Sequence, residues 1–181
     1  MHCWKTINVK KQYGLGRLFL LSTLVVILVF SFAYALLGII NNSHKSDDYF
    51  LIFMLAFLGV YPLHKLFHFI PMFSHRDKIK FIVINQFKFI PILHLRIIEP
   101  IQKSRFLFIL LAPFIFVNVL LVIGALTIPS FAHYFTILFA YHCGICLIDL
   151  IYVKNLSKSP KSAFIEETDA GYEILIAEPN Y

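Results

Sequence analysis

Four long apolar runs dominate the chain, and a polar stretch or a tight turn separates each from the next. They cover residues 18–40, 49–70, 106–128 and 131–153. A helix needs roughly 20 mostly apolar residues to cross a bilayer, so each run has a suitable length. The first and third runs contain no charged residue. The pattern therefore predicts four transmembrane helices.

The first run is predicted to be a retained span rather than a cleaved signal peptide. Lys10, Lys11 and Arg17 precede it, as basic residues precede a signal sequence. The apolar stretch nevertheless continues to Ile40, beyond the roughly 7–15 residues of a signal's apolar region. We therefore count it among the four spans.

Two further patterns predict short β structure outside the runs. Residues 79–84 and 87–95 are rich in β-branched and aromatic side chains, and Asn85-Gln86 is a candidate turn between them. Residues 162–166 and 172–176 flank a second candidate turn that ends at Gly171. We expect a hairpin in each place.

The distribution of lysine and arginine over the connecting segments predicts how the spans are oriented. The segment 1–17 holds four such residues, the loop 71–105 seven and the tail 154–181 three, whereas the loop between the first two runs holds only Lys45. Both termini and the middle loop are therefore predicted to be cytoplasmic, in a multi-pass protein of the cell membrane. The predicted fold class is an all-α integral membrane protein with four transmembrane helices and a small cytoplasmic β-hairpin element. Residues 18–153 form its membrane domain.

Composition supports this assignment. The chain is 59% hydrophobic and only 14% charged, whereas soluble proteins carry about a quarter charged residues. The net charge of +6 follows from the cytoplasmic loops and favours contact with anionic lipid. The predicted partner is therefore the lipid bilayer rather than a nucleic acid.

The candidate chemistry begins with the pentapeptide His64-Lys65-Leu66-Phe67-His68 near the end of the second run. Histidines four residues apart on a helix face the same way and can hold one metal ion. Metalloproteases write this motif His-Glu-x-x-His, in which the glutamate is the general base. Lys65 occupies the position of that glutamate, so the ligand pair lacks its base.

Polar residues in the fourth run could complete a metal site. At 1.5 Å per residue, His64 and Asp149 lie at similar depths, roughly 9 and 6 Å from the ends of their runs. His64, His68 and Asp149 would supply three ligands to zinc and leave a fourth position open. His142 is a further candidate ligand, and His133 belongs to the same polar set. The alternative is that these side chains bond to backbone carbonyls or extend toward the head groups.

The two cysteines of the fourth run, Cys143 and Cys146, have the spacing of a redox or zinc CxxC motif. They lie within a span and lack the βαβ context of a redox motif. Packing between helices is the favoured interpretation.

The order of these features resembles that of the putative zincin peptidase family, small bacterial membrane proteins distantly like site-2 proteases. The resemblance covers about residues 50–177. It implies the fold, zinc as the cofactor, and His64 and His68 as ligands. The other matching positions are Glu99-Pro100 after the β-rich segment, Ala112-Pro113 in the third run, His142, Gly144 and Asp149 in the fourth, and the tail 162–176.

Lys65 decides between the functional hypotheses. Losing a general base typically costs about 10²–10⁴-fold in rate. The favoured hypothesis is a degenerate, non-proteolytic member that binds a membrane protein or peptide segment. The first alternative is an active zinc peptidase near the cytoplasmic face, in which Glu99 or another carboxylate replaces the base. The second is a structural or regulatory membrane protein without metal.

Overall fold

The computed structural model describes residues 1–181 except 41–43, 74–78, 88–89, 98, 169–170 and 177–181, and it describes no side chains within 74–98. Four helices are long and apolar enough to cross a membrane, which confirms the predicted fold class. They are α2 (Leu15–Ile40), α3 (Phe50–Met72), α4 (Lys103–Thr127) and α5 (Ala132–Ser157).

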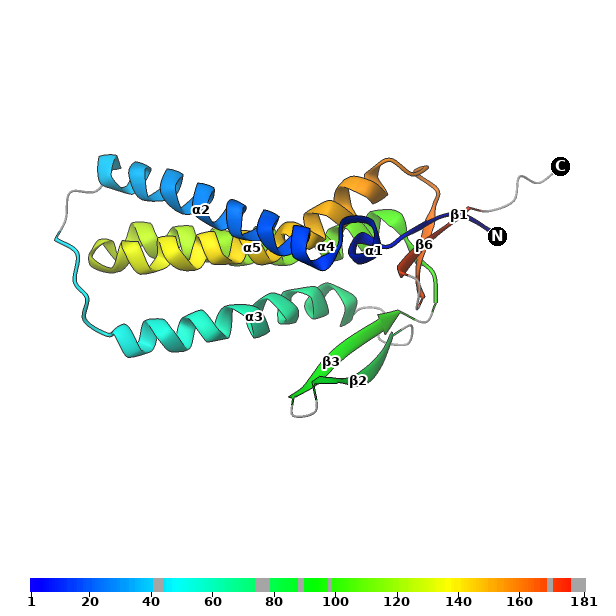
Figure 1. Ribbon diagram of the computed structural model, residues 1–181, viewed down its shortest axis with the longest axis horizontal. Helices are drawn as coiled ribbons and strands as arrows, with labels where there is room; N and C mark the ends of the chain where they lie inside the picture. Colours follow the sequence, from blue (N-terminus) through cyan, green and yellow to red (C-terminus); the bar gives the residue numbers. More distant parts are fainter. Residues whose placement is uncertain (41–43, 74–78, 88–89, 98, 169–170, 177–181) are drawn as a thin grey trace.

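The helices α4 and α5 form the centre of the bundle, with α2 on one side and α3 on the other (Figure 1). The crossing of α2 and α5 depends on Gly144, where a Cβ atom would overlap the side chain of Val26. The hydroxyl of Ser22 also donates to the Gly144 carbonyl across 2.7 Å. Small residues allow such close approach between membrane helices.

Stacked aromatic rings hold α3 against the central pair. Phe57 stacks on Tyr141 of α5 with ring centroids 4.2 Å apart, and Phe67 stacks on Phe116 of α4 at 5.6 Å. Phe57 lies about two turns before His64, and Phe67 lies between His64 and His68 in the sequence. They therefore set the face of α3 that is turned toward the bundle.

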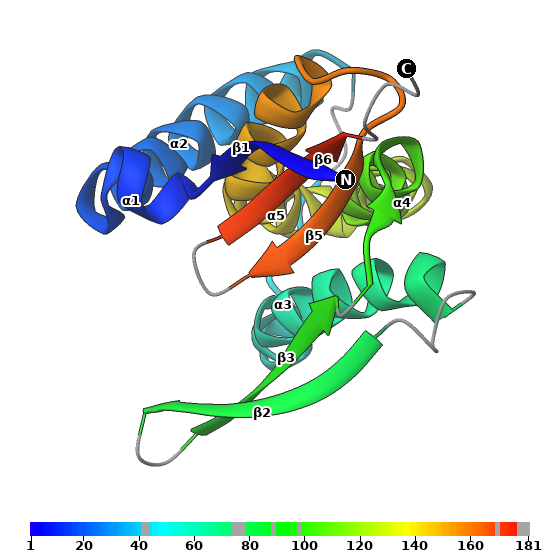
Figure 2. The ribbon, with the colours of Figure 1, turned by 90° about the vertical axis from the view of Figure 1, so that its right-hand side faces the viewer.

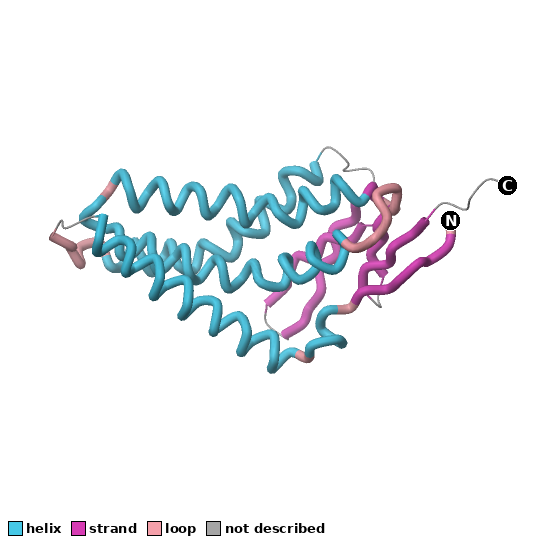
Figure 3. The backbone as a smooth tube through the Cα atoms, turned by 90° about the horizontal axis from the view of Figure 1, so that it is seen from above, coloured by secondary structure: helices cyan, strands magenta, loops and turns pink. Residues whose placement is uncertain are grey.

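Strands from distant parts of the chain gather at one end of the bundle, called the sheet end below (Figures 2 and 3). A four-stranded antiparallel sheet has the order β1-β6-β5-β4. Its strands are β1 (His2–Ile7), β4 (Ile101–Gln102), β5 (Phe164–Thr168) and β6 (Gly171–Ile176). The tail therefore forms a hairpin, as its sequence predicts.

Sequence analysis missed the N-terminal strand. β1 pairs with β6 and leads into the short helix α1 (Val9–Tyr13). Gly171 allows this pairing, because its φ is +125° and a Cβ there would overlap the Ile7 carbonyl oxygen. Residues 2–13 are thus part of the sheet end, and α2 begins directly after them.

The β-rich loop forms a separate hairpin of β2 (Ile79–Phe87) and β3 (Ile90–Ile97), on the α3 side of the molecule (Figure 2). The prediction of a turn at Asn85-Gln86 is wrong. Both residues belong to β2, and Asn85 pairs with Pro91. The ladder continues because the aromatic and β-branched pattern extends to Phe87, which keeps the strand favourable beyond the two amides.

An apolar core joins the four-stranded sheet to the helices. It contains Ile7, Ile165 and Ile174 from the sheet and Phe106 and Leu156 from α4 and α5. This end therefore folds as one unit with the membrane helices.

The buried ammonium of Lys103 stabilises the end of α5 within that unit. It donates to the carbonyl oxygens of Ser157 at 3.1 Å and Ser159 at 2.5 Å. A cation at a helix C-terminus pairs with free carbonyls and with the negative end of the helix dipole. α4 and α5 are thereby fixed to each other at the sheet end.

Candidate metal centre

The two histidines of the pentapeptide face the interior of the bundle. His64 and His68 lie one turn apart on α3, and only 3% and 9% of their surfaces are exposed. Lys65 and Leu66, which lie between them in the sequence, point to other sides of α3 and are exposed. The period of α3 thus places both histidines on its buried face, together with Phe53, Val60 and Met72.

Asp149 of α5 meets both histidines at the same point. Its Oδ2 lies 3.2 Å from Nε2 of His64 and 3.3 Å from Nε2 of His68. The two Nε2 atoms are 3.2 Å apart. We call these three residues the carboxylate cluster. Ligands at about 2.0–2.2 Å in a tetrahedral arrangement are separated by roughly 3.3–3.6 Å, so the spacing suits one zinc ion.

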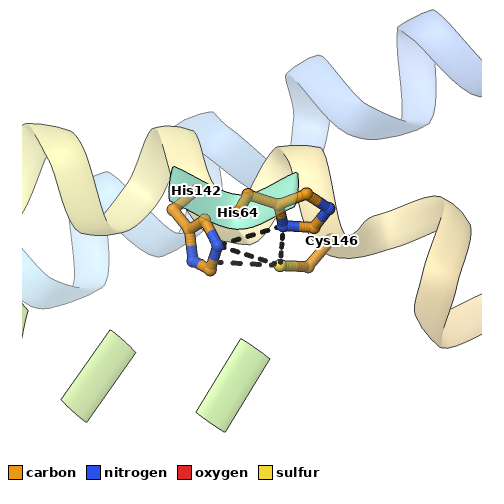
Figure 4. A group of neighbouring side chains, drawn as sticks. All are labelled: His64, His142 and Cys146. Carbon is orange, nitrogen blue, oxygen red and sulfur yellow. Dashed lines mark hydrogen bonds between the residues drawn. The ribbon is translucent and has the colours of Figure 1, made fainter. Parts of the chain in front are cut away.

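A second group lies behind the ring of His64. Its Nδ1 is 3.3 Å from Nε2 of His142 and 3.7 Å from Sγ of Cys146. Sγ of Cys146 is 3.4 Å from Nε2 of His142 (Figure 4). We call His64, His142 and Cys146 the thiol cluster. Each of the two groups presents three candidate ligand atoms within 4.8 Å of one another.

A backbone irregularity orients His68. Its Nδ1 lies 2.9 Å from the carbonyl oxygen of Ile109 on α4. In a regular helix this carbonyl would accept from the amide four residues later, but that residue is Pro113, which has no N–H. Pro113 therefore leaves the Ile109 carbonyl free to accept from His68. Because a carbonyl only accepts, the proton of neutral His68 lies on Nδ1 and its Nε2 is bare.

The orientation of His64 follows from a longer chain of hydrogen bonds. Nδ1 of His142 lies 2.8 Å from the amide oxygen of Asn118, which only accepts. Neutral His142 therefore carries its proton on Nδ1 and accepts at Nε2. The donor to that atom is Nδ1 of His64, 3.3 Å away. Nε2 of His64 is consequently bare as well.

Three lone pairs thus converge in the carboxylate cluster with no proton among them. Nε2 of His64, Nε2 of His68 and Oδ2 of Asp149 would repel one another unless a metal ion lay between them or one histidine carried an additional proton. Metal-binding histidines commonly donate their other ring N–H to a carbonyl or a further side chain, as both do here. The residues present therefore fit a zinc ion.

A metal-free protein can satisfy the same groups by reversing this chain. The Asn118 amide would turn and donate to His142, which would donate to His64, which would donate to Asp149. The structure places the Asn118 oxygen toward His142, which is the arrangement that corresponds to a bound cation.

The family model of the putative zincin peptidases matches residues 57–164, more than half of the chain. The protein belongs to this family. No curated protein and no solved structure matches the chain. The matched zincin region contains α4, α5 and all of the carboxylate and thiol clusters, whereas α1 and α2 lie outside it.

Lys65 departs from the zincin motif in residue type, and its side chain extends away from the two buried histidines. The residue is exposed, and its ammonium lies 5.7 Å from the ring centroid of Tyr61 on the outer surface of α3. Among the described residues, Asp149 is the carboxylate within ion-pair distance of the two histidines. The described part of the site therefore offers candidate zincin ligands without a separate general base.

The remaining predicted residues have different locations. His133 lies at the opposite end of the bundle, with Nε2 3.5 Å from Oδ1 of Asp47. Cys143 is buried beside Asn118, with 3.9 Å between Sγ and Oδ1. His142 is present at the site but contacts the rear of His64. The CxxC cysteines therefore do not face a common ligand position.

Asn118 and the contact of Cys146 with the histidines were not predicted from the sequence. One signal for Cys146 was available. His142, Cys146 and Asp149 are spaced by four and three residues, which places them on one face of a helix. Asn118 had no such signal, since a single amide in an apolar run acquires its role only from the helix packed against it.

Proposed function

We propose that this zincin-like membrane protein binds zinc through the carboxylate cluster and has lost peptidase activity, acting instead as a scaffold that binds a membrane partner. The observation that carries the proposal is the contrast along α3. His64 and His68 are buried against Asp149, whereas Lys65, about 100° round the helix from His64, is exposed. The ligand set is retained and the base is lost.

The metal would be held by Nε2 of His64, Nε2 of His68 and a carboxylate oxygen of Asp149. When bound, Zn²⁺ would supply a Lewis acid and hold α3 and α5 together. The protein supports it through Ile109 and Asn118, which fix the two ring orientations. A scaffold role needs only this binding and not a proton acceptor.

Lys65 cannot take over the part of the missing glutamate. A protonated amine donates three hydrogen bonds and offers no acceptor for a proton. Its side chain lies along the outer face of α3 over Tyr61. Glu99, the carboxylate considered as a substitute, is exposed after β3. These features support a non-proteolytic role over the active peptidase.

An apolar groove supports the binding of a membrane partner. It has a volume of about 700 Å³ and lies between α2, α4 and α5, with Cys143 at its wall. Cys143 also contacts Asn118, so the groove adjoins the chain of hydrogen bonds behind the metal ligands. We propose that a partner's transmembrane segment occupies this groove. A photo-crosslinker at Ala33, which lines the groove, should capture one membrane protein, whereas one at the exposed Phe19 should not.

The catalytic part of the proposal is tested by proteolysis in liposomes with zinc supplied. We would compare wild type, Lys65→Glu, Lys65→Gln and His64→Ala on a membrane-anchored peptide. Wild type and Lys65→Gln should be inactive, and Lys65→Glu should gain chelator-sensitive cleavage if the rest of the catalytic scaffold is intact. Chelator-sensitive cleavage by wild type that disappears in His64→Ala would revive the active peptidase.

Zinc content tests the metal separately. Purified wild-type protein should contain about one zinc per chain by elemental analysis, and His64→Ala should contain none. If the purified wild-type protein is folded but takes up no zinc when zinc is added, the result would favour the second alternative, a structural or regulatory membrane protein without metal.

We further propose that the sheet end is cytoplasmic. The basic segments of the chain lie mainly at this end. At the other end, the loop before α3 is tied to α5, where the Tyr134 hydroxyl donates to the Asp47 carbonyl. In a Cys3→Ser background, His44→Cys should react with an impermeant thiol reagent added outside, and Ser162→Cys should be protected. The reverse labelling would overturn the orientation.

A further inference from the structure

A polar pocket unrelated to the metal site lies where the N-terminal segment folds against the end of α5. Its volume is about 370 Å³, and β1, α1 and α5 contribute to its wall. Six of its seven lining residues are polar: Lys5, Thr6, Asn8, Lys11, Gln12 and Asn155, with Ile7 as the seventh. This differs from the apolar groove between α2, α4 and α5.

The pocket is positively charged. Lys5 and Lys11 both line it, and no described residue forms an ion pair with either ammonium. Within the sheet, the acidic residue Glu173 pairs with Thr6 in the register of β1 and β6. Glu173 does not line the pocket, and its carboxylate accepts from the Thr168 hydroxyl at 3.4 Å. The two ammonium groups are therefore available to a ligand.

A buried donor in the same wall lacks an acceptor. The side-chain nitrogen Nδ2 of Asn155 is shielded from solvent and has no hydrogen-bond partner. Buried amide donors are nearly always satisfied by protein, water or a ligand. An acceptor-rich group in the pocket would satisfy Asn155 and neutralise both lysines at once.

We infer that this pocket binds an anionic phosphate group, that of a phospholipid head group. Phosphate offers several strong acceptors to ammonium and amide donors. The pocket lies just before α2 begins at Leu15, close to the expected level of the lipid head groups. Clustered lysines next to a membrane span attract anionic lipids. Free phosphate presents the same chemistry, and the experiment separates the two sources.

The test uses the full-length protein in phosphatidylcholine nanodiscs. The probes are short-chain phosphatidylglycerol, short-chain phosphatidylcholine and inorganic phosphate. Binding is followed by the emission of Trp4, the single tryptophan of the chain and the neighbour of Lys5, and by native mass spectrometry of retained lipid. The variants are Lys5→Gln, Lys11→Gln and Asn155→Leu. Lys10→Gln is the matched control, because Lys10 is exposed on α1 and does not line the pocket.

Phosphatidylglycerol should bind saturably and more tightly than phosphatidylcholine. Each lysine substitution in the pocket should weaken it about fivefold, as expected for one charge near an anionic head group. Lys10→Gln should bind as wild type does. Equal binding of inorganic phosphate, with the same dependence on Lys5 and Lys11, would assign the site to free phosphate.

Two results would overturn the inference. One is the absence of saturable binding by either anion. The other is an equal effect of Lys10→Gln and Lys5→Gln, which would show only a diffuse attraction of the basic segment. The lysine variants alter exposed side chains, so the test stands even if Asn155→Leu does not fold. Zinc content does not enter the measurement, so its outcome is independent of the metal site.

Discussion

The carboxylate cluster and the thiol cluster share the ring of His64 but offer opposite surroundings to its two nitrogens. On one side, Nε2 faces His68 and Asp149 at 3.2 Å each. On the other, Nδ1 faces His142 and Cys146 at 3.3 and 3.7 Å. By distance alone both groups could hold a metal ion.

The positions of the protons separate the two clusters. The chain from His64 through His142 to Asn118 places an N–H at each step behind the ring. The same chain of hydrogen bonds leaves Nε2 of His64 without a proton, so the carboxylate cluster presents only acceptor atoms. The comparison teaches that a ligand set is defined by its outer hydrogen bonds as much as by its ligand atoms. We therefore expect zinc in the carboxylate cluster, with the thiol cluster as its support.

The largest effect is expected from Asp149→Asn. The carboxamide keeps the shape of the side chain but removes the negative charge that faces both histidines. Zinc affinity, measured by competition with a chelating dye, should fall by more than the roughly 10–100-fold typical of an outer-shell residue. Asp47→Asn, an exposed carboxylate at the other end of the bundle, is the control. If Asp149→Asn retained zinc with wild-type affinity, the carboxylate cluster would not be the zinc site.

The next effect is expected at Asn118. Asn118→Leu removes the acceptor for His142 and should weaken zinc binding by about 10–100-fold. Asn118→Asp offers only acceptors and should keep the proton on Nδ1 of His142, so it should retain zinc. If the metal-free chain with a donating Asn118 amide were native, Asn118→Asp would disrupt the site as strongly as the leucine does. The two variants thus test the direction of the hydrogen bonds.

A smaller effect with a distinctive sign is expected from Pro113→Ala. The new N–H would compete with His68 for the Ile109 carbonyl, so zinc affinity should fall by about tenfold. Helix stability should rise or stay unchanged, because proline is unfavourable within a helix. Pro62→Ala in α3 is the matched control. Equal zinc affinity in wild type and Pro113→Ala would show that the freed carbonyl does not orient His68.

The smallest effect is expected from Cys146→Ala, which should change zinc affinity by less than about threefold because sulfur lies behind the ring and is not a ligand. Cys143→Ala, buried on the same helix, is the control. Cobalt substitution gives a second measurement. A thiolate-to-cobalt charge-transfer band in wild type that disappears in Cys146→Ala would place the ion in the thiol cluster.

Much of the fold could be predicted from the sequence because bilayer crossing imposes a strong local signal. Runs of about 20 apolar residues identify spans without knowledge of their neighbours. The tail hairpin was also predictable, since Gly171 marks a turn between two β-rich stretches. The strand β1 was not, because its pairing partner β6 lies at the other end of the chain. The register of β1 depends on the edge of β6, which is present only once the tail hairpin has folded.

The sequence by itself determined the helix face that carries His64 and His68, the loss of the glutamate at Lys65, and the family to which these features belong. Helical periodicity fixes such relations within a few residues along the chain. Only the tertiary structure decided which nitrogen of His64 faces Asp149. That choice depends on Asn118 of α4 and His142 of α5, whose hydrogen bonds form only when the three helices are packed. The direction of a histidine lone pair depends on hydrogen-bond partners from other helices, and the spacing of residues along the sequence does not reveal those partners.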